Sequence, residues 1–147
     1  TWAGLVQLHG QSPWWLMYVL LLVWGADTGA YFAGRRFGKV KLAPAVSPAK
    51  TREGLYGGLL TTALVMLAVA FYLHLAGLQF LLFAAASAVT VLASVLGDLF
   101  ESMIKRRAGI KDSGKIFPGH GGALDRIDSI TAAAPVFLTG WWLAGGF

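Results

Sequence analysis

Long apolar stretches alternate along this chain with shorter segments that carry nearly all of its charge. The apolar stretches cover about 13–34, 55–78, 80–100 and 130–147. A helix needs about 20 apolar residues to cross the hydrocarbon core of a bilayer, and lipid offers unpaired backbone groups no partner. The pattern therefore predicts an all-α, multi-pass membrane protein with about four transmembrane helices and two charged cytoplasmic loops. In the fourth and shortest stretch, Pro135 predicts a kink.

The composition agrees with a membrane protein. Of the 147 residues, 56% are hydrophobic and 13% are charged, and the mean hydropathy is +0.64. Soluble domains typically carry about 25% charged residues. The length fits about one domain, so residues 1–147 are expected to form a single membrane domain. The chain has no cysteine, which excludes disulfides, thiolate metal sites and cysteine nucleophiles.

All twelve basic residues lie in two segments, 35–52 and 105–126. The link around 74–79 between the second and third stretches has no lysine or arginine. Basic loops of membrane proteins stay on the cytoplasmic side, so both basic segments should face the cytoplasm and both chain ends should face outward. The long apolar stretches argue against a nucleic-acid-binding protein, although basic loops alone would allow one.

Three aspartates are expected to meet at this cytoplasmic face. Asp98 lies at the predicted end of the third span, and Asp125 and Asp128 lie at the start of the fourth. Helical spacing puts Ser102 on the same face as Asp98. Carboxylates near lipid are costly unless they are paired or bound to a metal, and Mg²⁺ favours one or two carboxylates plus substrate phosphates. The aspartates could instead cap the fourth helix and pair with nearby basic residues, and for Asp128 the two interpretations weigh equally.

The segment between the third and fourth stretches holds further candidate chemistry. Four basic residues could hold a triphosphate: Lys105, Arg106, Lys111 and Lys115. Basic residues beside a membrane also attract anionic lipid without specificity, but Lys111 is followed by Asp112, which implies a fixed geometry. The glycines Gly121 and Gly122 would let backbone N–H groups approach phosphate oxygens, or they only form a tight turn. His120 could bind a phosphate, transfer a proton or be a structural turn residue.

Asp27 interrupts the first apolar stretch. An acidic residue inside a membrane span is a functional candidate by default. It could equally pair with an arginine of the following loop. The sequence leaves both interpretations open.

Two stretches of the chain closely resemble the phosphatidate cytidylyltransferase (CDP-diacylglycerol synthase) family. The later one reads S-x-x-K-R-x4-K-D-S-G-x3-P-G-H-G-G-x-L-D-R-x-D over 102–128 and follows G-D-x-x-E-S at 97–102. The earlier one, within 27–54, contains D-T-G-A-Y, G-R-x-x-G-K and S-P-x-K-T-x-E-G. The resemblance covers about 24–129. It implies that the phosphate of phosphatidate attacks the α-phosphorus of CTP, which yields CDP-diacylglycerol and pyrophosphate.

The resemblance also implies roles for individual residues. It implies Mg²⁺, with room for a second metal ion, held by Asp98 and Asp125 with Asp128 beside them. Catalytic roles would fall to Asp98, Asp125, Lys111, Asp112 and His120. Substrate contacts would come from Ser47, Lys50, Ser102, Lys105, Arg106, Lys115, Gly121, Gly122 and Arg126.

The resemblance implies partners and a location as well. The expected partners are CTP, phosphatidate, membrane lipid and a second copy in a homodimer, with no nucleic acid. The expected location is a bacterial inner (plasma) membrane, with the active site facing the cytoplasm. Members of the family are longer, so the chain is expected to correspond to their C-terminal catalytic part without the N-terminal spans. The alternatives are a relative acting on another lipid, such as a polyprenol kinase or an archaeal lipid cytidylyltransferase, and a non-enzymatic membrane transporter or scaffold.

Overall fold

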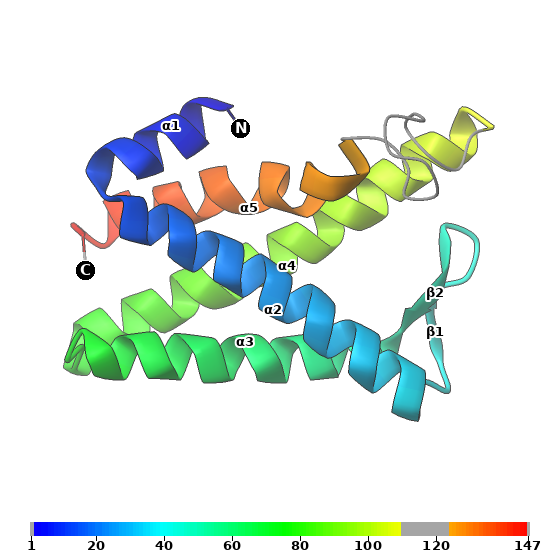
Figure 1. Ribbon diagram of the computed structural model, residues 1–147, viewed down its shortest axis with the longest axis horizontal. Coiled ribbons are helices and arrows are strands. Elements are labelled where there is room, and N and C mark those ends of the chain that lie inside the picture. The colour runs from blue at the N-terminus through cyan, green and yellow to red at the C-terminus, as the bar shows by residue number, and fades with distance from the viewer. Residues whose placement is uncertain (1, 110–123, 147) are drawn as a thin grey trace.

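The computed structural model describes the backbone of residues 2–109 and 124–146, with side chains for 2–109 and 129–146. Figure 1 shows helices packed around one another, with a small hairpin at one end. In chain order the elements are α1 (Trp2–Gln11), α2 (Pro13–Phe37), β1 (Lys41–Ala43), β2 (Ser47–Thr51), α3 (Arg52–Tyr72), α4 (Gly77–Arg107) and α5 (Leu124–Leu143). The predicted all-α class is confirmed, because the hairpin is the one β element in the described parts of the chain.

Three of the helices, α2, α3 and α4, are long and apolar enough to cross a membrane. The first two begin at side-chain caps, which satisfy backbone N–H groups that have no partner inside the helix. The hydroxyl of Ser12 accepts a hydrogen bond from the backbone N–H of Trp14 at 3.3 Å, and Thr51 accepts one from Gly54 at 3.1 Å. The first three predicted spans therefore correspond to helices of sufficient length.

The fourth predicted span corresponds to α5. Its apolar part with described side chains, Ser129–Leu143, falls below the length of the other three helices. The expected total of four transmembrane helices therefore stays a prediction. Pro135 lies inside α5, and the kink expected there stays a prediction.

The helix boundaries differ from those that hydropathy predicts. Helix α2 continues to Phe37 and α4 continues to Arg107, both well into the basic segments. Lysine and arginine are good helix formers, so the change from apolar to charged residues marks where lipid should end, not where a helix must end. Helix α3 stops earlier than predicted, at Tyr72. Hydropathy also missed α1, a ten-residue helix that packs on α2 and α5.

An aromatic cluster joins α2, α4 and α5 in the core. The ring of Tyr18 stacks on Phe83 with centroids 5.0 Å apart, and it lies 5.4 Å from the ring of Phe137. The Tyr18 hydroxyl forms a 2.7 Å hydrogen bond with the hydroxyl of Ser87. A buried phenol needs such a partner, so this bond fixes α2 against α4.

Helices α2 and α3 approach each other closely through glycines. A Cβ atom added to Gly57 would lie 2.2 Å from Cβ of Ala33, and one added to Gly29 would lie 2.2 Å from Oγ1 of Thr61. In lipid, helices associate through van der Waals packing, and small residues allow their backbones to meet. This seam holds the end of α2 beside the hairpin and the start of α3.

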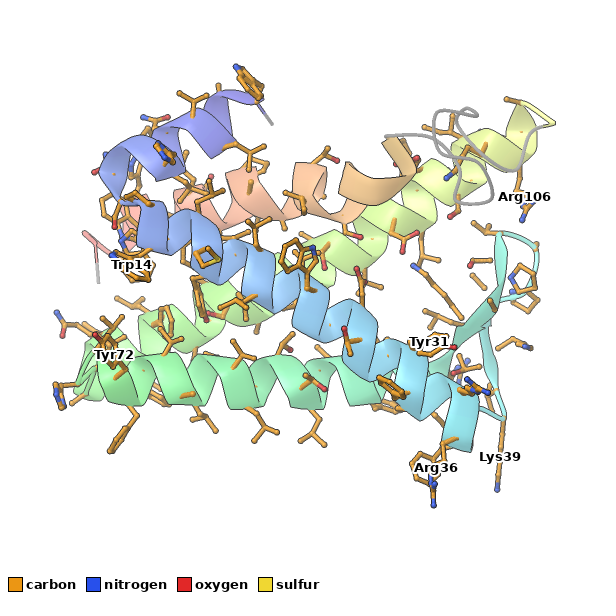
Figure 2. All side chains as sticks on the ribbon, viewed as in Figure 1. Trp14, Tyr31, Arg36, Lys39, Tyr72 and Arg106 are labelled. Atoms are coloured by element: carbon orange, nitrogen blue, oxygen red, sulfur yellow. The ribbon has the colours of Figure 1, made fainter. Side chains whose placement is uncertain are left out.

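The described basic residues gather at one end of the helix bundle. Figure 2 shows Arg36, Lys39 and Arg106 at this end, whereas Trp14 and Tyr72 lie at the other. The guanidinium of Arg106 donates from Nε to the carbonyl oxygen of Val46 at 3.4 Å. The end of α4 and the tip of the hairpin are therefore neighbours, although they come from different basic segments.

Candidate functional site

The hairpin of β1 and β2 positions Lys50, one of the predicted substrate-binding residues. Its strands pair antiparallel, with Lys41 opposite Thr51 and Ala43 opposite Ser47. The sequence predicted only a charged loop here. Strand-like alternation is too short in this segment to stand out, and of its two prolines Pro44 lies in the turn whereas Pro48 lies in β2.

A carboxylate at the start of α3 holds the base of the hairpin. Oε2 of Glu53 accepts hydrogen bonds from the backbone N–H groups of Lys39 at 3.1 Å and Val40 at 3.3 Å. The carbonyl of Val40 in turn accepts a 2.9 Å hydrogen bond from the N–H of Arg52. Because the hairpin is fixed to α3 in this way, the side chain of Lys50 near the end of β2 is directed towards α4.

Lys50 meets Asp98 there. The ammonium of Lys50 forms an ion pair with Oδ2 of Asp98, and the two side chains are 28% and 24% exposed. The hydroxyl of Ser102 donates to Oδ1 of Asp98 at 3.4 Å, which confirms the predicted shared face. Both carboxylate oxygens therefore have a partner.

The location of Asp98 differs from the prediction in one respect. It was expected at the cytoplasmic end of the third span, but α4 continues for nine residues beyond it, to Arg107. The continuation carries a second ion pair, between Lys105 and Glu101, with 3.2 Å between Nζ and Oε1. Lys105 was predicted to hold a phosphate, and in this structure it is engaged by a neighbour on the same helix. Glu101 was not among the predicted site residues, although its spacing of four residues from Lys105 indicated an ion pair on a helix.

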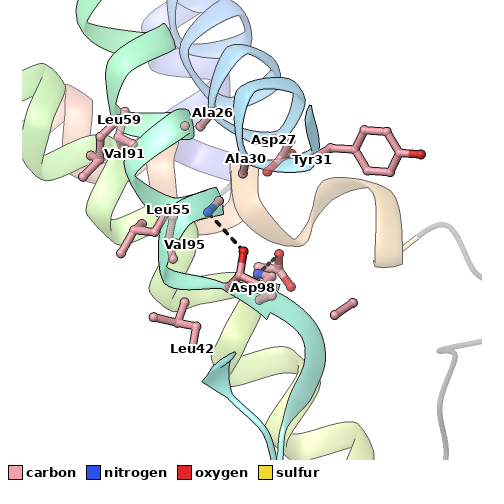
Figure 3. A pocket seen from close by; sticks show the side chains of 15 residues that line it. Ala26, Asp27, Ala30, Tyr31, Leu42, Leu55, Leu59, Val91, Val95 and Asp98 are labelled. Atoms are coloured by element: carbon pink, nitrogen blue, oxygen red, sulfur yellow. Dashed lines mark hydrogen bonds and ion pairs between the residues drawn. The ribbon is translucent and has the colours of Figure 1, made fainter. Parts of the chain in front are cut away.

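A cavity of about 230 Å³ lies between α2, β2, α3 and α4. Figure 3 shows Asp27 and Tyr31 of α2 and Asp98 of α4 at its wall. Lys50 and Thr51 add an ammonium and a hydroxyl from the hairpin. The rest of the lining is mainly aliphatic, with Leu42, Leu55, Leu59, Val91 and Val95.

The position of Asp27 gives this residue a place in the candidate site. From the sequence, Asp27 could be either a functional residue or the ion-pair partner of a loop arginine. The structure places Asp27 on the wall of the same cavity as Lys50 and Asp98. Two carboxylates and one ammonium therefore face a space that is otherwise apolar. Such a space suits a ligand with a charged end and an apolar body.

The remaining predicted residues divide into two groups. Ser47 starts β2, at the far end of the strand from Lys50, and Arg106 is exposed beside the hairpin tip. The positions Lys111, Asp112, Lys115, His120, Gly121 and Gly122 lie outside the described residues. For Asp125, Arg126 and Asp128, the backbone belongs to the first turns of α5, and the side chains lie outside the described part.

Asp98 has the donor chemistry that a magnesium ion requires. Its carboxylate faces the cavity and already accepts a cation, the ammonium of Lys50. Mg²⁺ prefers oxygen ligands and is commonly held by one or two carboxylates together with substrate phosphates and water. Among the residues that the structure describes, no three histidine, aspartate or glutamate side chains cluster closely enough to hold a metal ion. The other two predicted ligands are outside that search, so the metal site stays a prediction.

The chain matches known proteins over nearly its whole length. Residues 2–143 match the family model of the cytidylyltransferase family. A phosphatidate cytidylyltransferase of Pseudomonas aeruginosa is 52% identical over 148 residues, which cover 99% of this chain and 54% of that protein. The enzyme of the same name from Haemophilus influenzae is 56% identical over 128 residues, which cover 83% of this chain and 43% of the relative. The chain thus spans about half the length of the curated relatives it matches.

The fold also has a counterpart among solved structures. An intramembrane enzyme for archaeal membrane lipid biosynthesis superimposes with a TM-score of 0.63, over 84% of this chain and 75% of that chain. The two sequences are 22% identical. The likeness therefore concerns the fold.

Proposed function

This chain belongs to the cytidylyltransferase family, and from this premise we propose that it transfers the cytidylyl group of CTP to phosphatidate. The products are CDP-diacylglycerol and pyrophosphate. The observation that carries the proposal is the Lys50–Asp98 pair at the wall of a mainly apolar cavity. An anionic phosphate can bind where the ammonium lies, and the apolar lining can receive the body of a lipid. The two relatives that carry the name phosphatidate cytidylyltransferase support the choice of substrates.

The reaction needs no covalent enzyme intermediate. An oxygen of the phosphatidate phosphate attacks the α-phosphorus of CTP, a new P–O bond forms, and the bond between the α-phosphorus and the pyrophosphate oxygen breaks. The protein has to hold two anions close together and in line, because catalysis of phosphoryl transfer rests on positioning and on neutralising charge. In this scheme Lys50 leaves Asp98 and binds a phosphate oxygen. Residues outside the described part, Lys111 and Lys115 among them, are proposed to bind further phosphate oxygens.

We propose Mg²⁺ as the cofactor, held by Asp98 together with Asp125 and Asp128. When bound, it would neutralise part of the phosphate charge. The support from the described residues is the position of Asp98, whose carboxylate is held by Ser102 and faces the cavity. His120 and Asp112 are proposed to assist near the phosphates.

The location and assembly belong to the same proposal. The described basic residues lie at one end of the bundle (Figure 2), and basic ends of membrane proteins face the cytoplasm. We therefore place the site at the cytoplasmic face of a bacterial inner membrane. A homodimer is proposed on the family resemblance alone.

The direct test is turnover by the intact purified protein in lipid–detergent micelles. CTP and phosphatidate are supplied with and without Mg²⁺, and both CDP-diacylglycerol and pyrophosphate are measured. We expect equal amounts of the two products, and only with the metal. Diacylglycerol, which lacks the attacking phosphate, serves as the matched control lipid and should give no product. If a folded protein produces no CDP-diacylglycerol, or phosphorylates a lipid alcohol instead, the proposed reaction is wrong.

A further inference from the structure

A second, smaller hollow lies beside the candidate site, further into the helix bundle. It measures about 90 Å³ and is lined by residues of α2, α3 and α4. Leu59 and Val91 line both this hollow and the cavity that contains Lys50 and Asp98. The two spaces are therefore neighbours that share these two side chains as a common wall.

The smaller hollow lies deep in the segments that are long enough to cross a membrane. Its lining includes Ala63 of α3 and Ala88 of α4, both exposed on the surface of the bundle. Helices α3 and α4 are joined by the turn after Tyr72 and diverge from there (Figure 1), and they pack against each other less extensively than α2 and α3 do. In a bilayer, the space between them would open to the lipid chains.

The polar side chains of the hollow are already satisfied within the protein. The Thr62 hydroxyl donates to backbone carbonyls, with Gly58 and Leu59 oxygens each at 3.0 Å. The Ser87 hydroxyl bonds the Tyr18 hydroxyl at 2.7 Å and the carbonyl of Phe83 at 2.8 Å. Because both hydroxyls of the lining have partners, what the hollow offers a ligand is an apolar surface.

We infer that this hollow between α3 and α4 receives an acyl chain of the lipid substrate. The inference rests on the proposed function, because it takes the lipid phosphate to lie at Lys50. From that point an acyl chain would reach the hollow by displacing the side chains of Leu59 and Val91, which line both spaces. A lipid chain fits better than a second copy of the protein, because the hollow is small and shares the side chains of Leu59 and Val91 with the wall of the charged cavity. Ala84 and Ala88 stand one turn apart on its α4 side, and their small size leaves the space open.

A filling substitution with a matched control tests this path. Ala84→Leu should narrow the hollow, whereas Ala85→Leu changes the neighbouring residue, which lines a separate hollow between α4 and α5. The intact protein is assayed with dioctanoyl and dioleoyl phosphatidate. For Ala84→Leu we expect kcat/KM for the long-chain lipid to fall about tenfold or more, the scale on which apolar pockets discriminate against extra methylene groups. The short-chain lipid and the control variant should change by less than about twofold.

Several outcomes would overturn the inference. Equal losses with both lipids, or no loss with either, would mean that the acyl chain lies elsewhere. A changed oligomeric mass of Ala84→Leu with normal turnover of both lipids would identify the hollow as an interface between copies. If Ala84→Leu does not fold, Ala88→Leu replaces it on the same wall.

A second measurement does not depend on turnover. A phosphatidate with a photoactivatable diazirine near the end of one acyl chain is irradiated with the protein, and the labelled residues are found by mass spectrometry. We expect labels on α3 and α4 residues of the hollow, such as Met66 and Ala88. Labels on Leu82 or Val136, which line the α4–α5 hollow, would contradict the inference. Labels at the expected residues in a protein that produces no CDP-diacylglycerol would refute the proposed reaction and leave the acyl path standing.

Discussion

The ammonium of Lys50 and the carboxylate of Asp98, 48 positions apart in the chain, form an ion pair that joins the hairpin to α4. The sequence singled out the two residues for different tasks, Lys50 as a phosphate ligand and Asp98 as a metal ligand. A phosphate would compete with the carboxylate for the ammonium of Lys50, and a metal would compete with the ammonium for the carboxylate of Asp98. Substrate binding and metal binding are therefore expected to depend on each other.

Replacing Asp98 should abolish most of the activity. Asp98→Asn keeps the size of the side chain and one acceptor oxygen, but it removes the charge that a hard cation needs. We expect turnover to fall about 10²-fold or more, as when a group that neutralises transition-state charge is lost. Asp125→Asn should behave alike. The check is CTP turnover across a Mg²⁺ titration, with circular dichroism to verify folding. Near-normal turnover with normal Mg²⁺ dependence would exclude that residue as a metal ligand.

Replacing Lys50 should weaken binding or catalysis, and Lys41 provides a control on the same hairpin. Lys50→Met removes an ammonium that lines the cavity, whereas Lys41→Met removes an exposed one on β1. We expect Lys50→Met to lower kcat/KM about tenfold or more, because a charge-assisted hydrogen bond to phosphate is lost. Lys41→Met should stay within about twofold, as surface substitutions usually do. If both variants lower kcat/KM equally, Lys50 contributes only surface charge and is not a phosphate ligand.

The proposed orientation can be tested with single cysteines, since the chain contains none of its own. Ala45 lies at the hairpin turn, Gly109 follows α4, and Gly77 begins α4 at the opposite end. A membrane-impermeant maleimide should label cysteines at Ala45 and Gly109 only from the cytoplasmic side. A cysteine at Gly77 should react only from outside. Labelling at Gly109 from outside would place the candidate site on the wrong face.

The glycine seam between α2 and α3 should tolerate no added methyl group. Gly57→Ala would bring a Cβ within 2.2 Å of Ala33, whereas nothing lies within 4 Å of a Cβ added to Gly10. Overpacking of this kind typically costs about 1–3 kcal/mol. We expect a clearly lower thermal unfolding temperature for Gly57→Ala in detergent, with Gly10→Ala unchanged or slightly more stable. If the two variants have the same thermal unfolding temperature, the packing of α2 against α3 does not depend on this close approach.

Much of the fold could be predicted from the sequence because lipid imposes a simple rule. Apolar stretches of membrane length must be helical, and the ranges around α2, α3 and α4 were recognised for that reason. The same rule could not predict how far the helices continue into the basic segments, because charged residues outside lipid are free to remain helical. It also gave no signal for α1, which is only ten residues long.

The candidate site was predictable only in part. The motifs identified Lys50, Asp98 and Ser102 as candidates, and the spacing of four residues placed Ser102 beside Asp98, as the structure has it. The role of Asp27 could not be assigned from the sequence, because an acidic residue in a membrane span can belong to a functional site or form an ion pair with a nearby basic residue. Its place on the cavity wall follows from the packing of α2 against α3, which depends on glycines whose neighbours the sequence does not reveal.

The sequence by itself determined that this is a helical membrane protein with two basic segments and the motifs of a cytidylyltransferase, because hydropathy and motif spacing are local properties of the chain. Only the tertiary structure decided that β2 turns Lys50 towards Asp98 and that Leu59 and Val91 stand between a charged cavity and an apolar hollow. These relationships join residues that are far apart along the chain. They depend on how the helices cross and how closely they approach, and side-chain size at the crossing points decides both.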